Sequence, residues 1–185
     1  RYLLDLSFRE DASSRFGSDK RWAPFWSVGL GWNLHNEGFL KNVTFINRLK
    51  IRGSYGLTGS QNYNPYQAMT TYKYLTGERY HHTVGAEVMA LGNEKLGWQR
   101  TLQQNYGVDI DLWDERINFT GNYYIKLSKD VLTTVTLPPS LGFNSYMDNL
   151  GEVKNYGYEL NLRVALVKNL SKQLYWSVNA TALHN

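Results

Sequence analysis

Apolar and polar side chains alternate along this chain over long stretches, and this period of two limits its fold more than any other feature. Between residues 98 and 113 the apolar side chains fall on one side of an extended backbone: Leu102, Tyr106, Val108, Ile110 and Leu112. The positions between them are polar: Thr101, Gln103, Asn105, Asp109 and Asp111. Successive side chains of a β-strand point to opposite faces, so the pattern predicts a strand with one apolar and one polar face.

The same alternation recurs along the chain and predicts an all-β fold. The predicted strands cover residues 1–9, 22–34, 48–58, 98–113, 116–132, 150–167 and 173–184. Ordinary strands run about five or six residues, whereas a tilted strand that crosses a membrane needs about 9–11. The predicted strands reach the longer figure, which favours an antiparallel, up-and-down transmembrane β-barrel.

The connections between these strands are distributed unevenly over the two ends of the sheet. Connections 10–21, 59–97 and 133–149 fall at one end, and connections 35–47, 114–115 and 168–172 fall at the other. Outer-membrane barrels have short periplasmic turns and longer extracellular loops. The links 114–115 and 168–172 fit the periplasmic side, although 35–47 is longer than this rule expects.

In such a barrel the polar side of each strand faces the lumen and the apolar side faces lipid. The predicted lumen-lining residues are Gln103, Asn105, Asp109, Asp111, Asn118, Asn122, Asn161 and Arg163. The predicted lipid-facing residues are Tyr106, Val108, Ile110, Leu112, Phe119, Tyr123, Leu160, Leu162 and Val164. Aromatic residues near strand ends, such as Trp98, Trp113 and Tyr175, are candidates for interfacial girdles, with ordinary core packing as an equal alternative.

Composition agrees with strands and weighs against several other classes. Aromatic residues make up 15% of the chain, glycine is plentiful at 16 and proline scarce at 4. The formal charge of +4 comes from Lys and Arg scattered among Asp and Glu, so no basic run indicates a nucleic-acid partner. Cysteine is absent, which excludes disulfides and thiolate metal sites. No run of about 18 apolar residues predicts a membrane-spanning helix.

A series of segments, in order along the chain, resembles the SusC/RagA family of TonB-dependent transporters. One of them, residues 49–61, reads LKIRGSYGLTGSQ. The others are 9–17, 21–25, 27–33, 96–101, 105–109, 122–126 and 149–159. Any one of these segments is a weak match, but together and in this order they are specific.

This resemblance implies a large barrel plugged by an N-terminal domain, with residues 1–185 supplying about seven of its strands. The plug and the remaining strands would lie outside this sequence, which we interpret as an internal part of a barrel domain. The resemblance also implies active import of oligosaccharides (glycans) or peptides across the outer membrane of a Gram-negative bacterium. The expected partners are a SusD-like surface lipoprotein, outer-membrane lipid and the TonB complex, the last acting through the absent N-terminal region. No cofactor is implied.

Connection 59–97 is the predicted place for contact with cargo, because it is rich in aromatic side chains. The candidate ligand-binding residues are Tyr63, Tyr66, Tyr72, Tyr74, Tyr80, His81 and His82. Aromatic rings pack on the apolar surfaces of sugars, and loops on rigid scaffolds commonly carry binding groups. Packing within the connection, or against a lid protein, is the open alternative.

The sequence predicts neither a catalytic site nor a metal site. His81 and His82 are adjacent, so on a strand they point to opposite faces and do not converge. Asp109 and Asp111 could mimic a glycosidase pair, but pairing between neighbouring strands of a polar lumen is the favoured interpretation. No nucleophile elbow, phosphate loop or zinc motif occurs.

Two other classes remain as alternatives to transport. One is a soluble or surface β-sheet adhesin or carbohydrate-binding module, which detergent dependence would separate from a membrane barrel. The other is an outer-membrane barrel enzyme, which needs a convergent nucleophile and base that the sequence does not supply.

Overall fold

The structure is a computed structural model that describes residues 1–61, 64–169 and 174–185. Its strands are β1 (Tyr2–Ala12), β2 (Trp22–Asn33), β3 (Ile46–Ser60), β4 (Thr71–Tyr80), β5 (Thr83–Ala90), β6 (Gln99–Leu112), β7 (Ile117–Thr136), β8 (Ser145–Asn169) and β9 (Leu174–His184). Short 3-10 turns occur at η1 (Ser18–Lys20), η2 (Leu34–Asn36) and η3 (Pro139–Leu141). In the described part of the chain, no helix has the length and apolar character needed to span a membrane.

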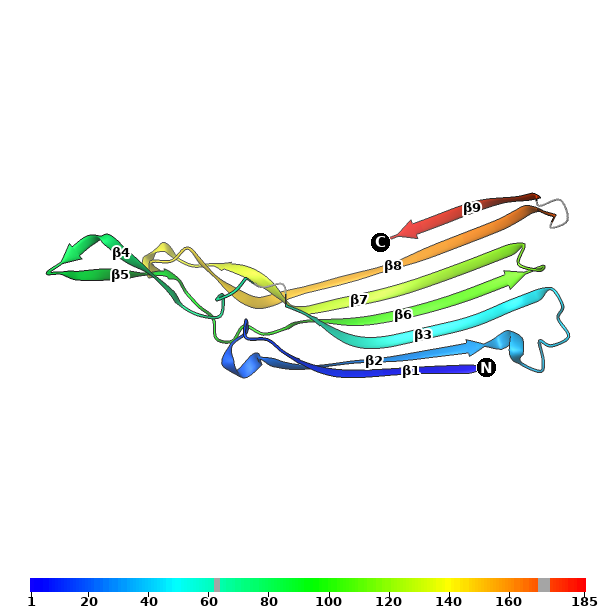
Figure 1. Ribbon diagram of the computed structural model, residues 1–185, viewed down its shortest axis with the longest axis horizontal. Coiled ribbons are helices and arrows are strands. Elements are labelled where there is room, and N and C mark those ends of the chain that lie inside the picture. The colour runs from blue at the N-terminus through cyan, green and yellow to red at the C-terminus, as the bar shows by residue number, and fades with distance from the viewer. Residues whose placement is uncertain (62–63, 170–173) are drawn as a thin grey trace.

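Seven strands form one antiparallel sheet in the order β1-β2-β3-β6-β7-β8-β9, which confirms the predicted strand number and topology. The strands lie side by side as a long curved ribbon (Figure 1). β4 and β5 pair only with each other. Their hairpin projects beyond one end of the sheet (Figure 1).

The predicted connections 133–149 and 59–97 were wrong in part, because each contains paired strands. β7 continues to Thr136 and pairs with the start of β8, with Thr133 opposite Asp148 and Thr136 opposite Ser145. Residues 133–136 are all β-branched, and such residues favour extended, paired backbone over a loop. In connection 59–97, the pairing of Thr71–Tyr80 with Thr83–Ala90 forms the separate hairpin.

The connections alternate between the two ends of the sheet because the strand directions alternate, and the longest one, residues 61–98 between β3 and β6, lies at one end. Figure 1 shows η1, the β4–β5 hairpin and the β7–β8 turn at one end, and the β2–β3 and β6–β7 connections at the other. We call these the long-loop end and the short-turn end. The β6–β7 connection contains only residues 113–116.

Among the described residues of the sheet few side chains are buried, because the sheet of this chain is not closed. A small apolar core lies at the long-loop end, where Phe16, Ala23, Phe25 and Trp98 are buried. The Trp98 ring centroid lies 4.7 Å from that of Phe16 and 5.3 Å from that of Phe25. Gly59 leaves room for this core, since a Cβ there would lie 2.1 Å from the Phe25 ring.

We predict that Gly59→Ala destabilises the intact protein by about 1–3 kcal/mol, the usual cost of overpacking a core. The matched control is Gly53→Ala on the same strand, where an added Cβ would make only ordinary contacts at 3.9 Å. Urea unfolding in detergent micelles measures both variants. Equal stability of the two would contradict the packing described at Phe25.

We also predict that residues 1–185 alone aggregate in plain buffer. β1 and β9 each pair on one side only, and large apolar side chains such as Leu4, Phe8 and Trp176 are more than half exposed. Unpaired strand edges and wide apolar surface drive association. Sedimentation with and without detergent tests this, and a folded monomer in plain buffer would instead favour the soluble adhesin or binding module.

Candidate functional site

The strand register separates the predicted lumen-lining and lipid-facing residues onto opposite faces of the sheet. In one cross-strand row Asp109, Thr120 and Asn161 are neighbours, and in the next row Asp111, Asn118 and Arg163 are neighbours. The register also places Gln103, Asn105 and Asn122 on this polar face. That this face lines a lumen stays a prediction.

The opposite face carries all the residues predicted to contact lipid. One row joins Ile110, Phe119 and Leu162, and another joins Tyr106, Tyr123 and Tyr158. The same face continues over β1 and β2 with Leu4, Leu6, Val28 and Leu30. We call it the apolar face.

A charged network crosses the middle of the polar face from β3 to β7. Arg52 Nε lies 3.2 Å from Asp109 Oδ2, and its terminal nitrogen donates to Asn122 Oδ1 at 2.5 Å. The arginine side chain crosses β6 above Gly107, where an added Cβ would lie 2.7 Å from its guanidinium carbon. The glycine therefore provides the space that lets one arginine side chain bond to two neighbouring strands.

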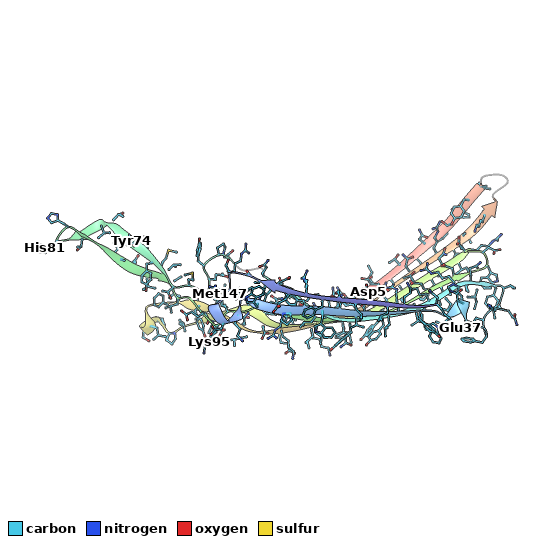
Figure 2. All side chains as sticks on the ribbon, turned by 60° about the horizontal axis from the view of Figure 1, so that its bottom comes forward. Asp5, Glu37, Tyr74, His81, Lys95 and Met147 are labelled. Atoms are coloured by element: carbon cyan, nitrogen blue, oxygen red, sulfur yellow. The ribbon has the colours of Figure 1, made fainter. Side chains whose placement is uncertain are left out.

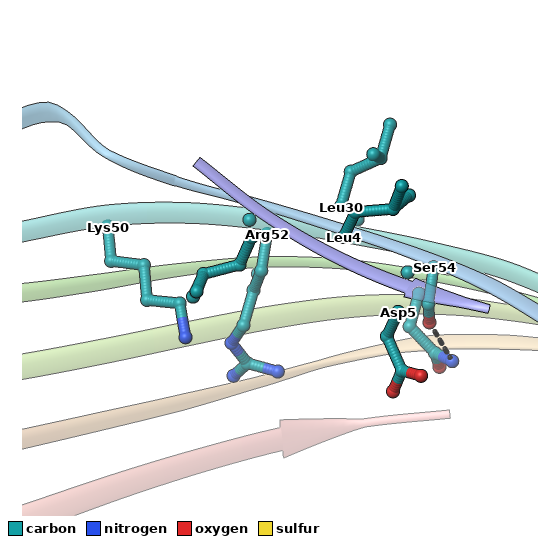
Figure 3. A pocket seen from close by; sticks show the side chains of 12 residues that line it. Leu4, Asp5, Leu30, Lys50, Arg52 and Ser54 are labelled. Carbon is teal, nitrogen blue, oxygen red and sulfur yellow. Dashed lines mark hydrogen bonds between the residues drawn. The ribbon is translucent and has the colours of Figure 1, made fainter. Parts of the chain in front are cut away.

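A hollow of about 410 Å³ lies beside this network over β1, β2 and β3. In Figure 3, Asp5, Lys50 and Arg52 project to one side of the sheet, whereas Leu4 and Leu30 project to the other. Gly29 and Gly31 border the hollow on β2, and their lack of side chains leaves it open. The polar side of this hollow therefore offers cations, a carboxylate and neutral hydrogen-bonding groups together.

Further hydrogen bonds between polar side chains cover the rest of the polar face, both between neighbouring strands and within β6. Asn105 Nδ2 donates to Ser54 Oγ at 3.1 Å, and Gln103 Nε2 donates to Asn105 Oδ1 at 3.2 Å. Nearer the short-turn end, Asn118 Nδ2 donates to Asp111 Oδ1 at 2.8 Å. Such a surface presents mixed donors and acceptors rather than one dominant charge, which suits hydroxyl-rich or amide-rich molecules.

At the long-loop end, a rim of backbone contacts ties the connections to the sheet. Trp98 Nε1 donates to the Arg21 carbonyl at 3.0 Å, and the Gly97 N–H donates to Asn149 Oδ1 at 2.8 Å. The Asn149 amide in turn donates to the Asp130 carbonyl at 2.7 Å. Trp98 is buried here, which favours core packing, the alternative to an interfacial girdle, for this residue. The Tyr175 hydroxyl accepts from Arg163 at 2.6 Å on the polar face, which likewise favours packing on the sheet over a girdle.

The predicted cargo-binding residues that the structure describes fall on or beside the β4–β5 hairpin. Tyr72 and Tyr74 share one face of β4 and are strongly exposed, as is Tyr66 in the preceding segment. His81 and His82 form the hairpin turn with φ of 44° and 65°. Figure 2 shows Tyr74 and His81 far from the sheet. Tyr63 and the side chain of Tyr80 lie outside the described residues.

Sequence reasoning missed Lys50, Arg52 and Gly107 as parts of the site. The alternation over 48–58 already placed the two cations on the polar face. What it could not supply was the register between β3 and β6, which sets Arg52 opposite Gly107. In the part of the chain that the structure describes, no group of three or more His, Asp or Glu side chains could hold a metal ion.

Comparison with known proteins places this sheet among barrels. Residues 1–184 match the family described as TonB dependent receptor-like, beta-barrel. The chain is 35% identical over 185 residues to a TonB-dependent receptor of Formosa agariphila and 35% identical over 196 residues to the TonB-dependent receptor SusC of Bacteroides thetaiotaomicron. Both matches cover 100% of this chain but only 17% and 19% of the relatives, so the chain spans about a fifth of their length.

Solved structures agree with this comparison. The chain aligns to the RagAB peptide importer in its closed-closed state with a TM-score of 0.84 and 30% identity, over 98% of this chain and 19% of that one. The open-open state gives the same TM-score, identity and coverage. These matches confirm the predicted resemblance and the antiparallel β-barrel fold.

The division into two faces predicts unequal costs for a lysine at adjacent positions of β6. Val108→Lys near the middle of the sheet should cost the intact protein roughly 2–4 kcal/mol if the apolar face meets lipid. Asp109→Lys, one residue on, should cost much less, because it points to the polar face. Unfolding in lipid vesicles measures both, and equal tolerance would contradict the assignment of the faces.

Proposed function

The chain belongs to the β-barrel family of TonB-dependent receptors, and on that premise we propose that it forms part of a transporter which imports oligosaccharides or peptides. Import would take place across the outer membrane of a Gram-negative bacterium. Residues 1–185 would supply a set of adjacent strands in the wall of a larger, plugged barrel, with the plug and the remaining strands outside this sequence.

One observation carries this proposal: the same strands present an exposed apolar face and a hydrogen-bonded polar face. A water-soluble sheet would cover its apolar face with a second layer. Here residues such as Leu4, Leu30 and Tyr106 stand open over the width of the sheet. Lipid would cover this face, and the network around Arg52 and Asp109 would face the lumen.

The unequal connections support one orientation of the sheet in the membrane. We place the long-loop end outside the cell and the short-turn end in the periplasm. The β4–β5 hairpin then stands at the barrel mouth, where Tyr66, Tyr72, Tyr74, His81 and His82 would meet cargo or a lid. Tyr63 and Tyr80 remain in the proposed set of cargo-contacting residues, as predicted from the sequence.

Two protein partners follow from the family. A SusD-like surface lipoprotein would cover the mouth of the barrel, and the structural similarity to the RagAB peptide importer supports such a pairing. The TonB complex would supply energy through the N-terminal region that precedes the barrel. Import requires no bond to be made or broken by this chain, so we assign it no catalytic residues.

We predict that loss of TonB function abolishes uptake by the complete transporter. A large barrel closed by a plug does not leak oligosaccharides or peptides passively, so transport has to be driven. Uptake of labelled cargo in cells with and without TonB measures this, with surface expression of the transporter checked in parallel. Normal uptake without TonB would reject active import.

We further predict that removing the β4–β5 hairpin lowers uptake while the barrel still assembles. Thr71 pairs with Ala90, so residues 72–89 can be replaced by a short linker without moving the flanking chain. A finer test replaces Tyr72 and Tyr74 together by serine, which should lower uptake roughly two- to tenfold if each ring stacks on cargo.

The matched control for this pair is Lys73→Ser. Lys73 points to the other face of the same strand and pairs with Glu87 at 3.9 Å. Unchanged uptake by a well-expressed hairpin deletion would remove the hairpin from the transport mechanism.

A further inference from the structure

The β6–β7 turn at the short-turn end holds an unusual backbone conformation. Trp113, Asp114 and Glu115 all have positive φ, at 51°, 54° and 64°. Each such residue with a side chain costs free energy, on the order of 1–3 kcal/mol, and persists only where surrounding contacts hold it. Strain of this kind commonly marks a site where the side chains of a turn have a task.

Several contacts hold the turn in this conformation. The Trp113 N–H donates to the Phe45 carbonyl at 2.8 Å, and the Asp114 N–H donates to Asn47 Oδ1 at 2.8 Å. Lys168 Nζ donates to the Asp114 carbonyl from β8. The Trp113 ring stacks on Phe45 with centroids 5.9 Å apart and planes at 28°, yet about half of each ring stays exposed.

A hollow of about 990 Å³ opens beside this aromatic pair. Its lining includes Ile117 and Val164, which pair across β7 and β8 on the apolar face. Arg116 and Asp114 also line it. In the described part of the chain, neither the Arg116 guanidinium nor the Asp114 carboxylate has a hydrogen-bond or ion-pair partner.

We propose that this hollow binds the headgroup of phosphatidylethanolamine from the surrounding membrane. Arg116 would bind the phosphate, Asp114 would bind the ammonium, and the Phe45–Trp113 pair would pack on the glycerol and upper acyl carbons. An exposed cation and an exposed carboxylate beside one apolar hollow complement a zwitterionic phosphate–ammonium group. The hollow is also continuous with the apolar face through Ile117 and Val164.

This inference rests on the proposed function only in assigning the apolar face to lipid. Glu115 marks the limit of the site, because it lines a different hollow with Asp111 and Arg163 on the polar face. The strained turn therefore separates two adjacent carboxylates, directing Asp114 to the apolar hollow and Glu115 to the polar one.

The test uses the complete transporter, purified in detergent and stripped of lipid. Native mass spectrometry measures its binding of phosphatidylethanolamine and of phosphatidylglycerol, which lacks the ammonium. Arg116→Gln should weaken binding of both lipids by at least about tenfold, as loss of one charge-assisted bond does. Asp114→Asn should weaken phosphatidylethanolamine by about tenfold and leave phosphatidylglycerol unchanged. Asparagine tolerates positive φ, so this variant keeps the turn.

Matched controls separate the site from general charge effects. Glu115→Gln and Arg163→Gln change neighbouring charges on the polar face and should leave the binding of both lipids unchanged. Arg116→Lys keeps the cation and should retain most phosphatidylglycerol binding. This variant still tests the role of the cation if Arg116→Gln fails to assemble.

Three results would overturn the proposal: wild-type binding of both lipids by Arg116→Gln, equal loss of both lipids in Asp114→Asn, or displacement of the lipid by inorganic phosphate. The last would reveal a bare anion site. Because lipid binding is measured without cargo or TonB, failure of import and failure of this site are distinguishable.

Discussion

Hydrogen bonding between long antiparallel strands is the constraint on which the rest of this structure depends. A backbone that lies in hydrocarbon has to pair its amides and carbonyls within the sheet, because no water is there to bond them. β3 pairs with β6 from Ile46 to Ser60, with one irregularity between Ile46 and Arg48, and it pairs with β2 on its other edge. Once the backbone is paired, alternate side chains can face two different environments, one apolar and one polar.

Different interactions stabilise the chain at the two ends of the sheet. At the long-loop end, a buried cluster around Trp98 holds chain segments that are far apart in sequence. At the short-turn end there is no such core among the described residues, and the β6–β7 turn is held instead by hydrogen bonds to Asn47 and Lys168. A rigid rim suits the end that carries the hairpin, whereas the opposite end leaves aromatic rings half-exposed.

Much of the fold could be predicted from the sequence because a period of two is a local signal. The alternation along one strand is enough to assign Val108 and Asp109 to opposite faces, because the assignment does not depend on which strands pair with it. The β4–β5 hairpin was missed because its strands lie in a long connection and pair only with each other. The burial of Trp98 was equally unpredictable, since it depends on Phe16 and Phe25, which are distant in sequence.

The residues of the candidate site could likewise be predicted where the signal is local, and could not be predicted where it depends on contacts between strands. Strand alternation found the polar residues of β6, β7 and β8 but could not indicate that Arg52 crosses Gly107 to reach Asn122. That contact depends on the register of three strands. Alternation alone does not fix this register, because a shift of two residues keeps every side chain on the same face. The positive φ values at the β6–β7 turn also left no sequence signal, because no glycine occurs there.

The most direct test of this account is a spin-label scan along β6 in lipid vesicles. Residues 1–185 contain no cysteine, so single cysteines at 105–112 can each carry one label in a complete barrel from which any cysteine elsewhere has been removed. The account predicts alternation: labels at 106, 108, 110 and 112 respond to oxygen dissolved in lipid, and labels at 105, 109 and 111 respond to a water-soluble nickel chelate. Accessibility that varies without a period of two, or with the faces exchanged, would contradict it.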